Sequence, residues 1–205
     1  MTLCLVTDRR GASVVEQCRD AVLAGIDLIQ VRERDLDAAA LSALVVDLVR
    51  LTRGTATRIV VNDRLDVAIA CGADGVHLRG DSIAAARARS MAPAGFLIGR
   101  SVHRADEAVR AAPEVDYLIA GTVFPTSSKP GLDRLLGLAG LASIVRAVSV
   151  PVLAIGGVSM DRIASVAEAG AAGVAAIGLF VEPGARVAEV VREARRRFDS
   201  VRSAS

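Results

Sequence analysis

The hydrophobic pattern alternates between two kinds of segment along the whole chain. Short runs of aliphatic and β-branched residues predict strands at residues 2–6, 28–31, 58–61, 75–78, 97–99, 117–120, 152–155 and 174–177. Between them, Ala-rich stretches with apolar residues at helical spacing predict helices at 13–24, 37–52, 64–71, 82–91, 104–111, 138–148, 161–169 and 186–198. Glycines stand just after three of these helices, at Gly25, Gly72 and Gly170, where a left-handed helix cap is expected.

Strict strand–helix alternation favours one fold class. It predicts a parallel sheet with right-handed crossovers, and strands that are apolar throughout are typical of a sheet buried on both faces. Eight such units most simply close into a small (β/α)₈ TIM barrel of the phosphate-binding type, formed by a single domain over residues 1–205. An open doubly wound sheet is the alternative.

Composition narrows the classes of function. Only 2% of the residues are aromatic and the formal net charge is +2, so neither a base-stacking platform nor a polyanion-binding surface is expected. Three widely spaced cysteines predict no disulfide framework, and we expect a reduced, cytoplasmic protein. The longest nearly apolar run, at 170–181, is too short to span a bilayer, and no signal peptide is read at the N-terminus.

Polar residues gather where the predicted strands end, which is the active-site end of a (β/α)₈ barrel. They are Thr7, Asp8, Arg9, Gln30, Arg32, Arg34, Asn62, Asp63, Arg64, His77, Asp81, Ser82, Arg100, Ser101, His103, the loop 121–131, Gly156, Gly157 and Gly178. Among them, the cations Arg32, Arg34 and Lys129 and the hydroxyls of Ser101, Thr126 and Ser128 are suited to phosphate. Gly156, Gly157 and Gly178 would let backbone N–H groups approach an anion.

Three of these residues have an alternative, purely structural interpretation. Asp63 has the hard oxygens that Mg²⁺ prefers, but it precedes a predicted helix and could be only an N-cap. His77 lies inside an apolar run and is better interpreted as a hydrogen-bonded core histidine. His103 could simply begin a helix.

Seven segments together resemble the thiamine phosphate synthase and TenI (thiazole tautomerase) family, and the resemblance covers the whole chain. The segments are LVTDR at 5–9, QVRERD at 30–35, VNDR at 61–64, GVHL at 75–78, IGRSVH at 98–103, GTVFPTSSK at 121–129 and IGGV at 155–158. The synthase branch joins an aminopyrimidine methyl pyrophosphate to a thiazole phosphate and releases pyrophosphate.

The resemblance implies roles for individual residues in that reaction. Gln30 and Ser101 would lie at the pyrimidine, and Arg32, Asn62 and Lys129 would hold the pyrophosphate. Asp63 would bind Mg²⁺, the expected cofactor. The thiazole phosphate would be held by Thr126, Ser128 and Gly157, with Gly156 and Gly178 beside them. Arg32, Lys129 and Ser101 would serve catalysis, because charge developing on a departing pyrophosphate must be stabilised.

The sequence departs from the family pattern at four places. Arg34 stands where the synthases usually have Lys. The second Mg²⁺ carboxylate is expected five residues after His77, where this chain has Ser82, so Asp81 is the nearest candidate for a second ligand. The Ile177-Gly178 pair replaces a Val-Ser pair. The Ser101–His103 triplet is more like the TenI branch, yet Thr122 occupies the position of that branch's catalytic histidine.

The leading hypothesis is therefore a Mg²⁺-using transferase of thiamine biosynthesis that acts on small phosphorylated substrates, with a homodimer as the suggested assembly. A metal-independent thiazole tautomerase is the chief alternative. A non-catalytic protein that binds thiazole phosphate or thiamine phosphate is the third.

Overall fold

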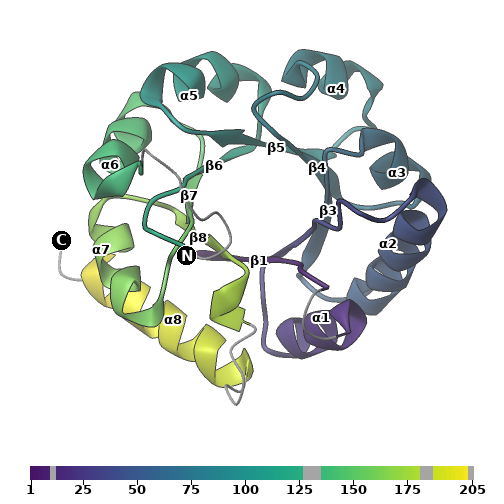
Figure 1. The fold of residues 1–205 in the computed structure, drawn as a ribbon, viewed down its shortest axis with the longest axis horizontal. Coiled ribbons are helices and arrows are strands. Elements are labelled where there is room, and N and C mark those ends of the chain that lie inside the picture. The colour runs from purple at the N-terminus through teal and green to yellow at the C-terminus, as the bar shows by residue number, and fades with distance from the viewer. Residues whose placement is uncertain (10–12, 127–134, 181–186, 203–205) are drawn as a thin grey trace.

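The strands close into a barrel surrounded by helices. The computed structural model describes residues 1–9, 13–126, 135–180 and 187–202. Within this part of the chain, parallel strands pair in chain order from β1 to β8, and β8 pairs with β1 (Figure 1). The predicted (β/α)₈ barrel is confirmed, and a closed ring is incompatible with the open-sheet alternative.

The elements follow the predicted alternation. The strands are β1 (Thr2–Val6), β2 (Leu28–Val31), β3 (Arg58–Asn62), β4 (Gly75–Leu78), β5 (Leu97–Val102), β6 (Tyr117–Gly121), β7 (Val152–Ile155) and β8 (Gly173–Ala176). The α-helices are α1 (Val14–Leu23), α2 (Ala38–Thr52), α3 (Leu65–Ala70), α4 (Ala85–Met91), α5 (Ala105–Ala111), α6 (Gly137–Ala147), α7 (Ile163–Glu168) and α8 (Val187–Arg202). Short 3₁₀ turns lie at η1 (Ala112–Glu114), η2 (Met160–Arg162) and η3 (Gly178–Phe180).

Two element boundaries differ from the prediction in ways that shape the site. β5 continues to Val102 instead of ending at residue 99, because its ladder with β6 runs on through Ser101. Residue 101 is therefore a strand residue. The helix predicted from residue 82 begins only at Ala85, since Ser82 instead closes a turn by accepting a hydrogen bond from the Arg79 amide at 2.8 Å.

The apolar residues form two separate layers because side chains alternate along a strand. One cluster fills the inside of the barrel: Cys4, Val6, Leu28, Val60, Tyr117, Ile119, Leu153 and Ala175. The neighbouring residues of the same strands, such as Leu3, Leu5 and Ile59, belong to a larger cluster beneath the surrounding helices. The inward positions at the carboxyl ends of the strands are thereby left to form a site.

The turns that lead from helix to strand confirm the predicted caps. Gly25, Gly72 and Gly170 all have positive φ, between 69° and 85°. In two of these turns an aspartate stands two residues after the glycine: Asp27 and Asp74.

Three aspartates tie neighbouring strands together at the amino-terminal end of the barrel. One carboxylate oxygen each of Asp27, Asp74 and Asp116 accepts the amide N–H of Leu3, Ile59 and Ile98, respectively, at 2.7 Å. Each aspartate also pairs with an arginine, from Arg195, Arg58 and Arg89 in turn. These floor aspartates therefore fix strand ends that lie away from the predicted site.

The basic C-terminal helix packs as an amphipathic helix. Val191, Ala194 and Phe198 of α8 are buried, and Arg195 donates to the carbonyls of Met1 and Gly25. Within the described residues, no helix combines the length and the apolar character needed to cross a membrane.

Candidate active site

A cavity of about 670 Å³ opens at the carboxyl ends of the strands. Its lining includes nine of the predicted site residues: Gln30, Arg32, Arg34, Asn62, Ser101, Thr126, Gly156, Gly157 and Gly178. One wall, from β2 to β5, carries Gln30, Asn62, His77 and Ser101. The opposite wall is apolar and carries Val6, Ile119, Ile155, Ala175 and Ile177. The cavity can therefore hold a ring that forms hydrogen bonds along one side only.

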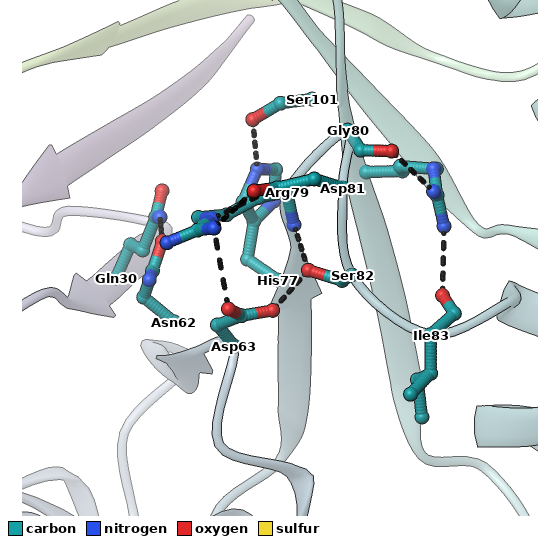
Figure 2. A network of polar contacts seen from close by, with 11 residues as sticks. Gln30, Asn62, Asp63, His77, Arg79, Gly80, Asp81, Ser82, Ile83 and Ser101 are labelled. Carbon is teal, nitrogen blue, oxygen red and sulfur yellow. Dashed lines mark hydrogen bonds and ion pairs between the residues drawn. The ribbon is translucent and has the colours of Figure 1, made fainter.

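Gln30 and Asn62 form a pair on the polar wall (Figure 2). The Gln30 Nε2 group donates to Asn62 Oδ1 at 2.9 Å. The other oxygen of the pair, Gln30 Oε1, is buried and has no hydrogen-bond partner among the described residues. A buried acceptor without a partner is costly, so this atom is suited to receive an N–H group from a ligand.

His77 supports Ser101 from beneath. Its ring nitrogens contact Tyr117 Oη at 3.2 Å and Ser101 Oγ at 2.8 Å, and the side chain is almost completely buried. Burial, with a smaller contribution from the positive charge of Arg100, lowers the pKa of His77 to about 3. The ring is thus neutral at physiological pH, and the core-histidine interpretation holds, although this histidine also orients a hydroxyl in the cavity.

Asp63 does not cap a helix. It has a φ of 61°, its carboxylate accepts a hydrogen bond from Ser82 Oγ, and the cap position of α3 falls on Arg64 without a side-chain bond. The capping interpretation is therefore wrong, and metal binding by Asp63 stays a prediction. On the other oxygen, Arg79 Nε lies 3.6 Å from Asp63 Oδ2 (Figure 2).

The Asp81 carboxylate binds Arg79 rather than lying beside Asp63. It binds the guanidinium of Arg79, with Nε to Oδ1 at 2.9 Å, and this pairing holds the pKa of Asp81 below its usual range. The side chain is 70% exposed. The residue that contacts Asp63 from this loop is Ser82, so Asp81 as a second metal ligand stays a prediction.

The predicted cations divide between the cavity and the surrounding loops. Arg32 and Arg34 line the cavity. Arg100 donates to the carbonyls of Gly80 and Ile83 and thereby fixes the loop before α4. Arg64 pairs with Asp66. Lys129 lies outside the described residues, as does Ser128.

The glycine pair after β7 is required by close packing. Gly156 and Gly157 have φ values of 98° and 61°. A Cβ atom on Gly157 would collide with the backbone carbonyl of Pro125, and one on Gly156 with the Thr122 side chain. The bare backbone at 156–157 therefore lies directly against the loop that carries Thr126, as a phosphate cradle requires.

Arg79 is a site residue that the sequence analysis does not single out. Arg79 follows β4 immediately and lines the cavity. Its position could have been predicted from the sequence, because a charged residue next to the end of a barrel strand lies at the active-site end.

His103 also lines the cavity: its ring contacts the Gly121 carbonyl, and its amide donates to Glu107 at 2.7 Å.

Fold and site together define the class of protein: a (β/α)₈ barrel enzyme with an active site for small phosphorylated substrates. The family model described as "Thiamine monophosphate synthase" matches residues 3–180. The chain belongs to this family.

Relatives of known name agree. The thiamine-phosphate synthase of Methanoculleus marisnigri is 41% identical, with 98% of this chain and 96% of the relative covered. That of Methanoregula boonei is 44% identical over 83% of this chain and 80% of its own length. The solved structure of thiamine phosphate pyrophosphorylase from Pyrococcus furiosus aligns with a TM-score of 0.87 at 36% identity, covering 98% of this chain and 96% of that one.

Proposed function

We propose that this protein is a transferase of thiamine biosynthesis that joins an aminopyrimidine methyl pyrophosphate to a thiazole phosphate. The observation that carries the proposal is the asymmetry of the cavity, which has one hydrogen-bonding wall, one apolar wall and a rim of arginines and glycines. In the reaction, the bond between the pyrimidine methylene and the pyrophosphate oxygen breaks. A bond from that methylene to the thiazole nitrogen forms, and pyrophosphate leaves.

The polar wall is suited to the pyrimidine. Gln30 Oε1 is a buried acceptor without a partner, which matches an exocyclic amino group. Ser101 Oγ, oriented by His77, is the second polar group on this wall. Because the electron-rich aminopyrimidine can carry positive charge on its methylene, holding the ring in place matters more here than a strong base.

The cationic rim is suited to the pyrophosphate. Arg32 and Arg34 would bind its oxygens, together with Lys129. Asn62 would donate through Nδ2, since its Oδ1 already accepts from Gln30. These donors would stabilise the charge that grows on the leaving group as the C–O bond breaks.

The donor set at Asp63 fits a Mg²⁺ ion. The Asp63 carboxylate and the Ser82 hydroxyl supply adjacent hard oxygens, and Mg²⁺ commonly binds through one or two carboxylates plus substrate phosphates. Within the described segments no three His, Cys, Asp or Glu side chains gather as a metal cage. The ion would neutralise pyrophosphate charge when bound, with Asp63 as its protein ligand and Asp81 as the predicted second one.

The cradle after β7 would hold the second substrate. Gly156 and Gly157 present backbone against Thr126, with Gly178 exposed at the end of the next strand. Thr126 and Ser128 would supply hydroxyl donors to the thiazole phosphate.

The tautomerase alternative is not favoured. The two curated relatives reported above are named thiamine-phosphate synthases, and Thr122 occupies the position of the tautomerase histidine. A proton-transfer enzyme would have to use His77 or His103. Burial keeps His77 neutral with a pKa of about 3, far from the value that a general acid or base needs near neutral pH.

One assay tests the function. The purified protein would be mixed with the pyrimidine pyrophosphate, thiazole phosphate and Mg²⁺, and pyrophosphate release would be followed. Asp63→Ala and Lys129→Ala should each abolish release while far-UV circular dichroism is unchanged. Absence of turnover in the unmodified protein, with thiazole phosphate still bound, would exclude the synthase and leave the ligand-binding alternative. Isomerisation of a thiazole carboxylate phosphate without metal would support the tautomerase.

A cytoplasmic location and a homodimer complete the proposal. Cys4, Cys18 and Cys71 are all free thiols, which agrees with a reducing compartment. Burial raises the pKa of Cys4 and Cys18 to about 12, so both stay protonated and unreactive. Sedimentation analysis would test the dimer.

A further inference from the structure

Each oxygen of the Asp63 carboxylate has a neighbouring polar or charged side chain. Ser82 Oγ donates to Oδ1, and the positively charged Arg79 side chain lies 3.6 Å from Oδ2 (Figure 2). The Asp63 side chain is only 30% exposed, and it does not line the cavity at the strand ends described above, whereas Arg79 does. A metal ion approaching from the cavity therefore meets Arg79 before it meets Asp63.

Arg79 is held in this position by its own loop. Its guanidinium binds Asp81 through two nitrogens, and its amide donates to Ser82 Oγ at 2.8 Å. Arg79 thus forms ion pairs with two carboxylates, one in the site and one on the surface. The Arg79 guanidinium can therefore move away from Asp63 and still keep its ion pair with Asp81.

We propose that Arg79 is the resident counter-ion of Asp63, which it gives up when Mg²⁺ arrives with a diphosphate. A divalent cation bound at Asp63 Oδ2 would be repelled by the guanidinium, whose Nε lies 3.6 Å from that oxygen. Metal binding to the free protein therefore works against the Arg79–Asp63 pair. The released guanidinium then faces the cavity and serves as a further donor to the diphosphate.

The surrounding charges favour this order of binding. Arg34 lines the cavity together with Arg79, and both also line a second cavity beside it. Clustered cations repel a free divalent metal and attract a diphosphate. Mg²⁺ that enters bound to the diphosphate carries the anion that draws Arg79 away from Asp63. The diphosphate part of this inference depends on the proposed function, while the competition between Arg79 and metal does not.

The test uses Mn²⁺ as a paramagnetic probe in place of Mg²⁺. Free Mn²⁺ would be titrated into the full chain and followed by electron paramagnetic resonance. Arg79→Gln should bind free Mn²⁺ about fivefold more tightly than the unmodified protein, the factor that corresponds to a partly exposed ion pair worth about 1 kcal/mol. Arg79→Lys keeps the charge and should remain close to the unmodified protein.

A second titration uses preformed Mn²⁺–pyrophosphate, measured by calorimetry. Here Arg79→Gln should bind several-fold more weakly, because the variant lacks the released donor. The sign of the effect therefore reverses between the two titrations. A change of site charge alone also reverses the sign, so the size of the effect is compared with that of a control arginine in the same cavity.

Arg9→Gln is the matched control. Arg9 also lines the cavity, is 44% exposed and pairs with a carboxylate, Asp35, but it makes no contact with Asp63. Its removal should change Mn²⁺ affinity far less than removal of Arg79. Thermal unfolding of each variant would establish that it is folded.

Three results would overturn the inference. They are equal Mn²⁺ affinity in Arg79→Gln and the unmodified protein, an equal effect of Arg9→Gln, or Arg79→Gln changing both titrations in the same direction. Absence of turnover by the unmodified protein would instead count against the proposed function, and the titration with free Mn²⁺ would still decide whether Arg79 competes with metal at Asp63.

Discussion

Mild acid should destabilise the barrel through His77. The side chain is buried as the neutral ring between Tyr117 and Ser101, with its pKa lowered from 6.5 to about 3. In the unfolded chain the same ring takes up a proton near its ordinary pKa. The unfolded state therefore binds more protons than the folded state across this interval, and the free energy of unfolding falls as pH decreases through 6.5.

The magnitude follows from the two pKa values. At about pH 5, the ring is largely protonated in the unfolded chain and neutral in the folded one, which costs about 2 kcal/mol relative to pH 7.5. That loss is a large fraction of a typical total stability of about 5–15 kcal/mol. The carboxylates with lowered pKa, such as Asp81 and Asp66, make the stability depend on pH in a lower range. Their stabilisation is lost only as pH falls below about 4, so they do not obscure this window.

Urea unfolding at about pH 7.5 and about pH 5 would measure the effect. His77→Gln should be less stable than the unmodified protein at neutral pH but should lose about 2 kcal/mol less on acidification. His103→Gln removes the only other histidine and should keep the full loss. If the unmodified protein and His77→Gln lost the same stability between the two pH values, the argument from His77 would be refuted.

Three further changes test other parts of the molecule. Gly157→Ala should raise the KM for thiazole phosphate by up to about a hundredfold, since the added methyl group displaces the loop at Pro125; Gly80→Ala, which has open space around it, should not. Steady-state kinetics would decide, and a normal KM in Gly157→Ala would count against the cradle. Asp74→Ala should cost about 1–3 kcal/mol in urea unfolding with kcat/KM unchanged, because it leaves the Ile59 amide without its acceptor; Asp47→Ala, an exposed surface pair, should cost far less. Ser82→Asp should lower the Mg²⁺ concentration for half-maximal activity several-fold, and unchanged metal dependence would contradict placing the ion beside residue 82.

The fold was predictable because the signal is periodic and repeated. Each strand is buried on both faces, so its apolar run stands out, and each helix shows an apolar stripe. The boundaries were less predictable where polar residues belong to strands. Ser101 follows Arg100 and looks like the start of a loop, yet it pairs with Ile119 in the β5–β6 ladder and is therefore part of β5.

The sequence predicts which residues lie at the carboxyl ends of the strands. It does not predict which of them contact one another. The sequence shows that Asp81 and Ser82 are neighbours, but it does not show which one turns toward Asp63. That choice depends on the turn in which Ser82 accepts the Arg79 amide while Asp81 binds the Arg79 guanidinium. The predicted roles of Ser128 and Lys129 lie outside the described residues and remain expectations from the resemblance.

The floor aspartates divide the barrel into strand pairs that are not equally secured. Asp27, Asp74 and Asp116 tie β1 to β2, β3 to β4 and β5 to β6, and each of these pairs has a carboxylate brace. At the corresponding point of the last pair stands Ala172, whose amide binds the Val152 carbonyl at 2.8 Å but which has no carboxylate to return the bond. The β7–β8 pair, which carries the proposed phosphate cradle at its other end, is therefore the quarter of the ring with the weakest brace at its base. In native-state hydrogen exchange, the β7–β8 pair should open at lower free energy than the three braced pairs. The proposed cradle would then lie on the strand pair that unfolds locally most easily.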